Sequence, residues 1–186
     1  MTAISDRVAA LRAELANAGL SGFLVPLTDE HMSEYVGAYA RRLEWLTGFT
    51  GSAGSGVVLA DKAAIFVDGR YTLQAAREVD DRLFAIEHTP ASNPGRWLAG
   101  AAQTGARIGF DPWLHTSAQL ASLQSAAPDI SLVPVSPNPV DRIWYDRPLP
   151  SVEPAEPHAP AFAGEPHQRT CEILAESLRA SGADTV

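Results

Sequence analysis

The sequence contains one cysteine, Cys171, and no long run of apolar residues. A single cysteine excludes an internal disulfide framework and a cysteine-based zinc site. Its place in an apolar helical pattern favours a small core residue over a nucleophile. The longest apolar runs, residues 22–26 and 63–67, are too short to cross a bilayer, and the charged start lacks the apolar region of a signal peptide. We therefore expect a soluble, cytoplasmic protein.

Basic residues are also scarce, with 14 Lys and Arg against 22 Asp and Glu and a net charge of -8. Such a surface repels phosphate backbones and anionic lipid, so neither nucleic acid nor a membrane is an expected partner. The apolar fraction of 46% and the charged fraction of 19% are typical of folded globular domains. The length allows one well-packed domain and the beginning of another.

Helical and strand patterns alternate along the first part of the chain. Val8, Leu11 and Leu15 predict a helix over residues 6–18, with Ser5 as its N-cap and Gly19 as its C-terminal stop. Strands are predicted at 22–25, 56–59, 63–67, 83–87, 107–110 and 131–135, and further helices at 71–79, 93–103 and 116–126. The second and third strands are close enough to form a hairpin. This alternation predicts an α/β domain whose mixed sheet is flanked by helices.

A proline-rich stretch follows this domain and predicts an extended linker. We therefore divide the chain into a first domain at 1–147, a linker at 148–164 and the start of a second, truncated α/β domain at 165–186. A shift of 163 residues places Leu11 on Leu174, a weak indication of duplication. Because an isolated terminal helix cannot bury its apolar stripe, we expect the natural protein to continue.

Three carboxylates and a histidine gather just after the first strand, in Asp29, Glu30, His31 and Glu34. Functional loops often occupy this position. His31 and Glu34 would share one face of a helix, but no second histidine or carboxylate pair has a recognised ligand spacing. We favour a polar loop in which Asp29 and Ser33 bond neighbouring backbone groups.

The glycine-rich segment 47–56 resembles a phosphate-binding loop only superficially. It lacks the Gly-Lys-Ser/Thr ending and leads into a strand where a nucleotide-binding loop requires a helix. A tight turn that lets Trp45 and Phe49 pack beneath the sheet is the favoured interpretation.

Asp68 and Arg70 stand between the third strand and the next predicted helix, where Asp68 can cap the helix and Arg70 projects from its first turn. A cation at this end opposes the helix dipole. That cost suggests that Arg70 binds an anion or a carbonyl, although a salt bridge to Asp29, Glu30 or Glu34 explains it equally well.

Five segments, in order, resemble the amino-terminal domain of the aminopeptidase P family, the Xaa-Pro aminopeptidases of the creatinase and prolidase group: residues 7–12, 29–35, 45–54, 68–71 and 138–144. The resemblance implies a ribonuclease H-like first domain, a second related domain and a pita-bread catalytic domain. The catalytic domain, which would hold two divalent metal ions, usually manganese, is absent from these residues. We therefore expect no catalytic residue, metal ligand or cofactor here, and no activity from this segment alone.

The resemblance also implies that the whole protein cleaves the bond between an amino-terminal residue and a following proline, and that it works as a homodimer. Peptides with proline at the second position would be its substrates. Arg70 would contact the bound peptide, with His31, Trp45 and Tyr71 as second-rank candidates on the same rim of the substrate entrance. The alternative is a stand-alone oligomerisation or peptide-binding module; the five segments disfavour creatine hydrolysis and initiator-methionine removal.

Overall fold

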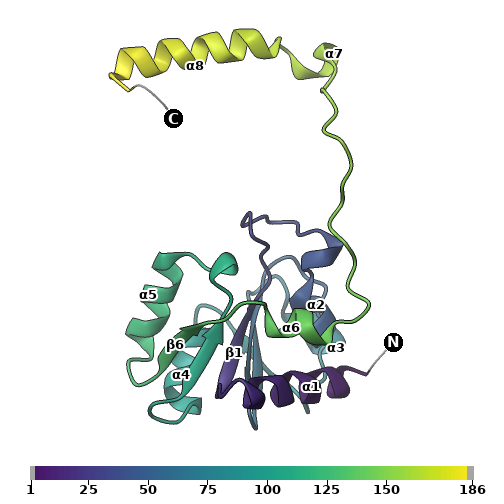
Figure 1. Cartoon of the computed structure of the whole chain (residues 1–186), viewed down its shortest axis with the longest axis vertical. Helices are drawn as coiled ribbons and strands as arrows, with labels where there is room; N and C mark the ends of the chain where they lie inside the picture. Colours follow the sequence, from purple (N-terminus) through teal and green to yellow (C-terminus); the bar gives the residue numbers. More distant parts are fainter. Residues whose placement is uncertain (1–2, 184–186) are drawn as a thin grey trace. The chain divides into compact units, whose positions relative to one another are not determined.

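The computed structural model describes residues 3–183 of the chain. The chain divides into two compact units, Met1–Pro150 and Ser151–Val186 (Figure 1).

The first unit is built on a sheet with the strand order β4-β3-β2-β1-β5-β6. β2 pairs antiparallel with β1 and β3, whereas β3 with β4, β1 with β5 and β5 with β6 are parallel. All strands except β2 therefore run in one direction. The predicted mixed sheet and its β2–β3 hairpin are confirmed. The strands are β1 (Gly22–Pro26), β2 (Ser55–Leu59), β3 (Ala63–Val67), β4 (Ala85–His88), β5 (Arg107–Phe110) and β6 (Ser131–Pro134).

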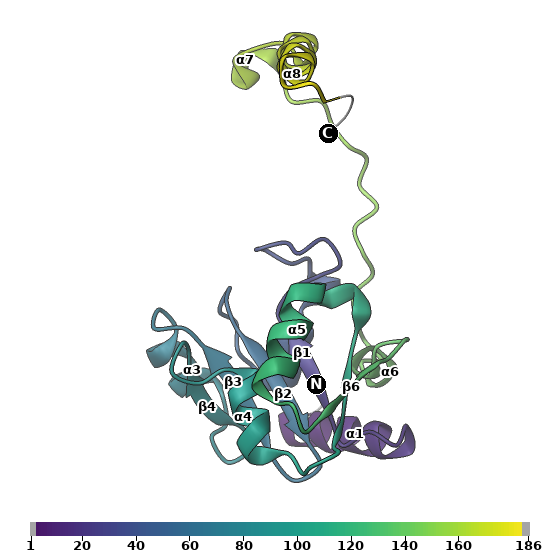
Figure 2. The ribbon, with the colours of Figure 1, turned by 90° about the vertical axis from the view of Figure 1, so that its left-hand side faces the viewer.

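Helices cover both faces of this sheet (Figures 1 and 2). Residues of α1 (Ile4–Asn17), α2 (Arg42–Thr47), α3 (Thr72–Glu78) and α6 (Pro139–Ile143) enter one apolar cluster. Residues of α4 (Pro94–Ala101) and α5 (Ser117–Ala126) pack against the other. Short 3-10 helices occur at Ala38–Ala40 (η1) and Pro112–Leu114 (η2).

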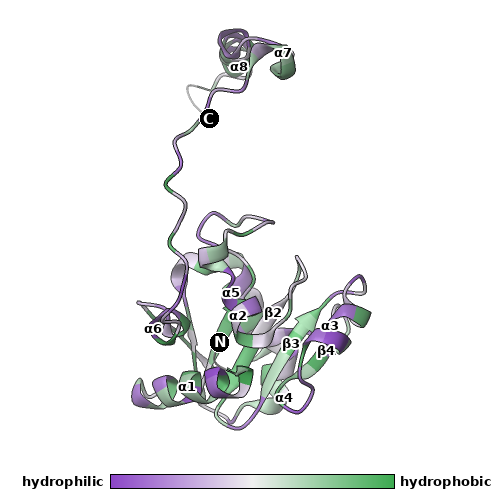
Figure 3. Cartoon of the chain, turned by 90° about the vertical axis from the view of Figure 1, so that its right-hand side faces the viewer, coloured by the Kyte–Doolittle hydropathy of each residue, from purple (hydrophilic) through white to green (hydrophobic). Residues whose placement is uncertain are grey.

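Successive residues of the central strands point to opposite faces and so enter different clusters. Phe23 and Val25 of β1 lie in the α1-side cluster, and Leu24 lies in the α4-side cluster. A sheet buried on both faces needs apolar residues at every position, and the central strands are correspondingly apolar along their length (Figure 3). This explains why β1 and β3 appear in the sequence as unbroken apolar runs.

The helix ends test the sequence predictions directly. α1 begins at Ile4 after the N-cap Ala3, so the prediction of Ser5 as N-cap is wrong. Gly19 has φ +64, and the N–H of Leu20 donates to the carbonyl of Leu15 at 2.9 Å, which confirms the C-terminal stop.

The caps of α4 and α5 follow sequence rules. The Asn93 side chain accepts from the N–H of Arg96, as its place before a proline predicts. Thr116 and Gln119 form a capping box at α5. The fourth strand starts two residues later than predicted, because the N–H of Leu83 bonds to the turn at Asp80.

The sequence patterns missed α2 and α6. The Asn138 side chain caps α6 by accepting from the N–H of Val140 at 3.0 Å, and α2 ends at Gly48, whose φ is +82. Helices of one or two turns offer too few residues to show a 3.6-residue period.

The second unit contains α7 (Pro160–Ala163) and α8 (His167–Ser181), and α8 ends at Gly182 with φ +69. Cys171, predicted to be a core residue, is exposed, as are Ile173 and Leu174. The core prediction for Cys171 is therefore wrong in this structure, because no described residue of α8 is buried. The strand expected to begin at 184–186 lies outside the described residues.

A buried ion-pair cluster ties α2 to the end of the first unit. Nε and Nη2 of Arg42 donate to the two carboxylate oxygens of Asp141, 2.7 and 2.9 Å away, across 99 residues of sequence. Nη1 of Arg147 lies 2.7 Å from Asp141 Oδ2, and its Nε donates to the carbonyl of Tyr39. Because Arg42 is only 6% exposed, its charge depends on this carboxylate for compensation.

We predict that Asp141→Ala destabilises this chain by about 3–5 kcal/mol, because the substitution leaves a buried guanidinium without its counter-ion. Urea unfolding monitored by far-UV circular dichroism measures the change. Glu44→Ala, which breaks the exposed Arg41–Glu44 pair in α2, is the matched control and should cost about 0.5 kcal/mol or less. Equal midpoints for the two variants would contradict the prediction.

Candidate functional site

The carboxyl ends of the parallel strands meet at one edge of the sheet, which is where open α/β sheets bind ligands. The loop at 27–41 follows β1, the segment 68–71 follows β3, and the glycine-rich loop at 48–54 leads into the antiparallel β2. The topology therefore brings three of the segments singled out in the sequence to the same edge.

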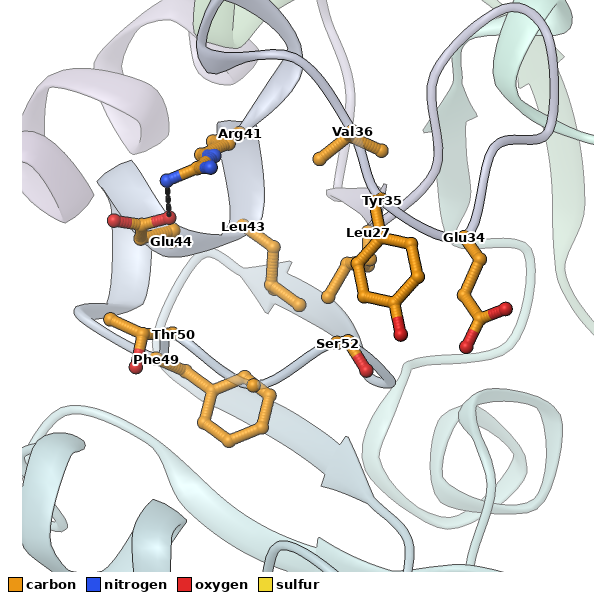
Figure 4. Close-up of a pocket in the computed structure, with 11 residues that line it drawn as sticks. Leu27, Glu34, Tyr35, Val36, Arg41, Leu43, Glu44, Phe49, Thr50 and Ser52 are labelled. Atoms are coloured by element: carbon orange, nitrogen blue, oxygen red, sulfur yellow. Dashed lines mark ion pairs between the residues drawn. The ribbon is translucent and has the colours of Figure 1, made fainter. Parts of the chain in front are cut away.

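A cavity of about 240 Å³ lies between the first and the third of these segments (Figure 4). The hydroxyl groups of Tyr35 and Ser52 and the carboxylate of Glu34 lie on one side of it, and the Arg41–Glu44 ion pair lies on the other. Its full lining is Leu27, Glu34, Tyr35, Val36, Arg41, Leu43, Glu44, Phe49, Thr50, Gly51 and Ser52.

Tyr71 closes the glycine-rich loop against the sheet. Its hydroxyl lies 2.7 Å from Ser52 Oγ, and its ring meets Phe49 edge to face at a centroid distance of 5.6 Å. A Cβ atom at Gly51 would lie 2.3 Å from Phe49 and 2.7 Å from Tyr71, so only glycine fits between the rings. Phe49 is completely buried, which confirms the tight-turn interpretation for that residue.

A second network holds the same loop from α3. The Glu78 carboxylate accepts hydrogen bonds from the Thr50 N–H at 2.8 Å and from the Thr50 hydroxyl at 2.9 Å. The Gln74 side-chain amide donates to the Thr50 hydroxyl and to the Glu78 carboxylate. Burial raises the pKa of Glu78, but the hydrogen bonds from Thr50 and Gln74 outweigh it and lower the pKa overall. This network leaves no signal in the sequence, because Gln74 and Glu78 form an ordinary i,i+4 pair that gives no sign of a distant partner.

Arg70 lies just before α3 and is not part of its first turn, since the helix begins at Thr72 with Tyr71 as its N-cap. The dipole argument for Arg70 is therefore wrong. Its ion-pair partner is Asp68, with Nη2 2.7 Å from Oδ2, and none of the carboxylates proposed from the sequence. The Arg70 N–H also donates to Asp68 Oδ1, which shows that Asp68 organises the turn before the helix.

The Arg70 guanidinium stays accessible although it is oriented. Its carbon lies 5.2 Å from the centre of the Tyr71 ring, and 66% of the side chain is exposed. The side-chain hydrogen bond to Asp68, followed by the charge of that residue, raises the pKa of Arg70; Glu34 on the cavity rim adds a smaller contribution. Nε and Nη2 bond Asp68, while Nη1 has no hydrogen-bond partner among residues 3–183.

The polar loop after β1 is organised by Asp29. Its Oδ1 accepts from the N–H of His31 at 3.0 Å and of Ser33 at 2.9 Å, which confirms the polar-loop interpretation for Asp29. His31 is exposed and does not line the cavity, and its Nε2 lies 3.9 Å from Glu30 Oε1.

Residues 3–183 contain no group of three or more His, Cys, Asp or Glu side chains that could hold a metal ion. The donors in this part of the chain therefore do not fit a catalytic metal centre.

Trp45 does not line the cavity. Its ring stacks on Trp144 at a centroid distance of 5.3 Å, and the Arg7 guanidinium lies 4.8 Å from its centre. Arg7 also donates to the Trp45 carbonyl. Tyr71 thus joins Arg70 to the cavity lining through Ser52 and Phe49, whereas Trp45 packs against α1 and the residue that follows α6.

We predict that the Asp29 carboxyl titrates below its ordinary pKa of 3.8, because hydrogen bonds from Ser33 and then from His31 outweigh the effect of burial, which raises the pKa. A lowered carboxylate pKa adds stability that is fully present above the ordinary value and is lost as pH falls through the lower one. Carbon-13 NMR of the labelled carboxyl group gives the midpoint.

A synthetic peptide of residues 27–35 provides the unfolded reference for this titration. An Asp29 midpoint equal to that of the peptide would show that the loop hydrogen bonds are not formed. As a structural check, Asp29→Asn keeps the Oδ1 acceptor and should retain slow amide exchange at His31 and Ser33, whereas Asp29→Ala should lose it.

The fold and the site define an α/β domain with a cavity at the carboxyl edge of its sheet and without a metal cluster in its described part. Residues 7–143 match the family described as the creatinase/prolidase N-terminal domain. The chain belongs to this family.

Curated relatives include Xaa-Pro aminopeptidase 2 of Mus musculus, 37% identical over 159 residues, and a probable Xaa-Pro aminopeptidase P of Coccidioides posadasii, 35% identical over 179. The matches cover 84% and 94% of this chain but 23% and 29% of those proteins. The chain therefore spans less than a third of the length of either relative.

Two solved structures are similar. X-prolyl aminopeptidase from Caenorhabditis elegans, described as a cytosolic enzyme with a di-nuclear active site, is 31% identical with a TM-score of 0.83, over 98% of this chain and 32% of that one. The N-terminal domain of the cytoplasmic peptidase PepQ from Mycobacterium tuberculosis is 30% identical with a TM-score of 0.57, over 74% of this chain and 98% of that one. Within residues 3–183, no helix is long and apolar enough to span a membrane.

Proposed function

We propose that this chain is the non-catalytic amino-terminal part of a metallo-aminopeptidase that hydrolyses the bond between an amino-terminal residue and a following proline. The likeness to the C. elegans X-prolyl aminopeptidase over 98% of this chain is the observation that carries the proposal. Curated relatives with the same named activity support it independently.

The proposed hydrolysis takes place in a catalytic domain outside this chain, on two divalent metal ions such as manganese. Metal ions supply an activated water and polarise the carbonyl that it attacks. The di-nuclear active site described for the C. elegans enzyme supports this division of labour, and its description as cytosolic supports a cytoplasmic location. Within the chain, we assign 1–147 to the first domain, 148–164 to the linker and 165–186 to the start of a second domain.

The first domain would shape the substrate entrance, with Arg70 contacting the bound peptide. Three features support this role: its exposed side chain, the orientation that Asp68 and Tyr71 give it, and its free Nη1 within the described residues. Tyr71 would position Arg70. None of the four candidates lines the cavity itself. The Tyr71 hydroxyl lies 2.7 Å from the lining residue Ser52, whereas His31 lies beside Glu30 and Trp45 stacks on Trp144, so His31 and Trp45 are weaker candidates.

Arg70 would contact a peptide bound at a catalytic centre in another domain of the same chain or, in a homodimer, in the other subunit. In the second case the substrate site would be complete only in the dimer. In either case the contact is made to the peptide and not to the metals, so a loss of Arg70 would leave the metal content unchanged.

In the full-length enzyme, we predict that Arg70→Ala lowers kcat/KM for an Xaa-Pro peptide at least about tenfold through a lost substrate contact. The melting temperature should stay nearly unchanged, because exposed ion pairs contribute little to stability. Steady-state kinetics and thermal unfolding on the same preparation, with its metal content measured, test both statements.

Arg82 provides a matched control for Arg70. It pairs with Asp80 in the same way, with Nη2 2.7 Å from Oδ2 and its N–H on Asp80 Oδ1, and it is also exposed. Neither arginine lines the cavity, but the Arg70 guanidinium, unlike that of Arg82, lies over Tyr71, whose hydroxyl contacts the lining residue Ser52. Arg82→Ala should therefore leave kcat/KM unchanged. An equal loss in both variants, or normal activity in Arg70→Ala with a large drop in melting temperature, would refute the substrate contact.

A further inference from the structure

An exposed tyrosine forms one side of the cavity between the loop after β1 and the glycine-rich loop (Figure 4). Tyr35 lines this cavity, yet the residue is 80% exposed. Folding of the chain therefore leaves most of an aromatic ring in water next to a concave surface. An aromatic ring in this position is typical of a surface that contacts a ligand.

The loop that carries Tyr35 has a defined and strained backbone. Within residues 3–183, Met32 is the only non-glycine residue with a positive φ, at +56. Residues other than glycine rarely adopt this conformation. Two loop N–H groups on the Asp29 carboxylate, and the Met32 N–H on the Asp29 carbonyl at 3.1 Å, hold the turn in place. Strained backbone that neighbouring hydrogen bonds maintain is concentrated at ligand sites.

The size and lining of the cavity fit one apolar side chain. Its volume of about 240 Å³ lies below the roughly 300–1,000 Å³ of sites that enclose a whole small molecule. Leu27, Val36, Leu43 and Phe49 give it an apolar lining, and the last two are buried, so they close its inner end. A group that fills this space is therefore an apolar part of a larger ligand.

The charges of the lining disfavour an acidic group. The lining contains two glutamates and one arginine, and Arg41 and Glu44 lie 3.5 Å apart and compensate each other. Glu34 is left as the net charge, so a carboxylate that entered the cavity would be repelled and would lose its hydration. Because Glu34 is exposed, water screens its attraction for a basic group.

Two contacts connect this cavity with Arg70. The charge of Glu34 contributes to the raised pKa of Arg70, and the Arg70 guanidinium lies over Tyr71, whose hydroxyl is 2.7 Å from Ser52 of the lining. An enzyme that removes one residue before proline holds that residue and the proline at its catalytic centre. The part of the peptide that extends to an entrance is therefore the part after the proline.

We propose that the cavity is a subsite for an apolar side chain that follows the proline of the substrate, and that Tyr35 determines the preference for such a side chain. This inference rests on the proposed peptidase function and adds to it a class of peptide. It also adds Tyr35 as a residue that contacts the substrate.

Four amidated peptides test this preference in the full-length enzyme: Ala-Pro-Leu-Leu, Ala-Pro-Gly-Gly, Ala-Pro-Lys-Lys and Ala-Pro-Asp-Asp. We expect kcat/KM for the Leu-Leu peptide to exceed that for the Gly-Gly peptide at least about fivefold, with the Asp-Asp peptide the poorest. Tyr35→Ala should lower the Leu-Leu to Gly-Gly ratio at least about threefold, whereas Tyr35→Phe, which keeps the ring, should retain it. A loss of folded or metal-loaded enzyme affects both peptides equally, so it does not change the ratio.

Tyr145→Ala is the matched control, because Tyr145 is 93% exposed and does not line the cavity, so its loss should leave the ratio unchanged. If the enzyme hydrolyses none of the four peptides, the proposed function is overturned and this inference with it. The inference alone is overturned by hydrolysis with a Leu-Leu to Gly-Gly ratio near one, by equal ratios in Tyr35→Ala and Tyr145→Ala, or by a preference for the Lys-Lys or Asp-Asp peptide.

Discussion

Burial of the sheet on both faces is the constraint on which the rest of the first unit depends. Phe23, Val25 and Leu24 alternate between two apolar clusters, so a shift of one residue would exchange the two faces of β1. The register that avoids this pairs Leu24 with Val57 across the β1–β2 boundary. Once the register is set, the carboxyl ends of the parallel strands meet at one edge of the sheet. The polar loops at 27–41 and 68–71 begin at this edge.

Two kinds of contact hold that edge. Around the cavity, Gly51 admits the Phe49 and Tyr71 rings, and Glu78 fastens Thr50 from α3. Between α2 and α6, ion pairs hold the edge, because the Asp141 carboxylate binds both Arg42 and Arg147. The first arrangement leaves Arg70 exposed beside Tyr71, and the second leaves one Arg42 nitrogen buried without an acceptor. The exposed Arg70 nitrogen without a partner in the described residues is a donor, which explains why a peptide oxygen rather than a cation is proposed to bind there.

Local rules predicted the helix caps and the strands well. The Asn93 cap and the helix end at Gly19 depend on hydrogen bonds between residues only a few positions apart. Their geometry can therefore be inferred from the neighbouring residues in the sequence. The prediction of Ser5 as N-cap failed because the helix begins two residues earlier than expected, without a side-chain cap. The short helices α2 and α6 were not predicted, because packing and the Arg42–Asp141 pair stabilise them and they show no amphipathic period.

The sequence by itself determined the α/β class, the family signatures and the position of the glycine-rich turn, because each depends on local periodicity, turn chemistry or residue identity. Only the tertiary structure decided that Trp45 stacks on Trp144, 99 residues away. It also placed Arg42 against a carboxylate 99 residues away. The reason is physical: partners brought together by strand order have no fixed separation along the chain, so their pairing depends on how the sheet is assembled.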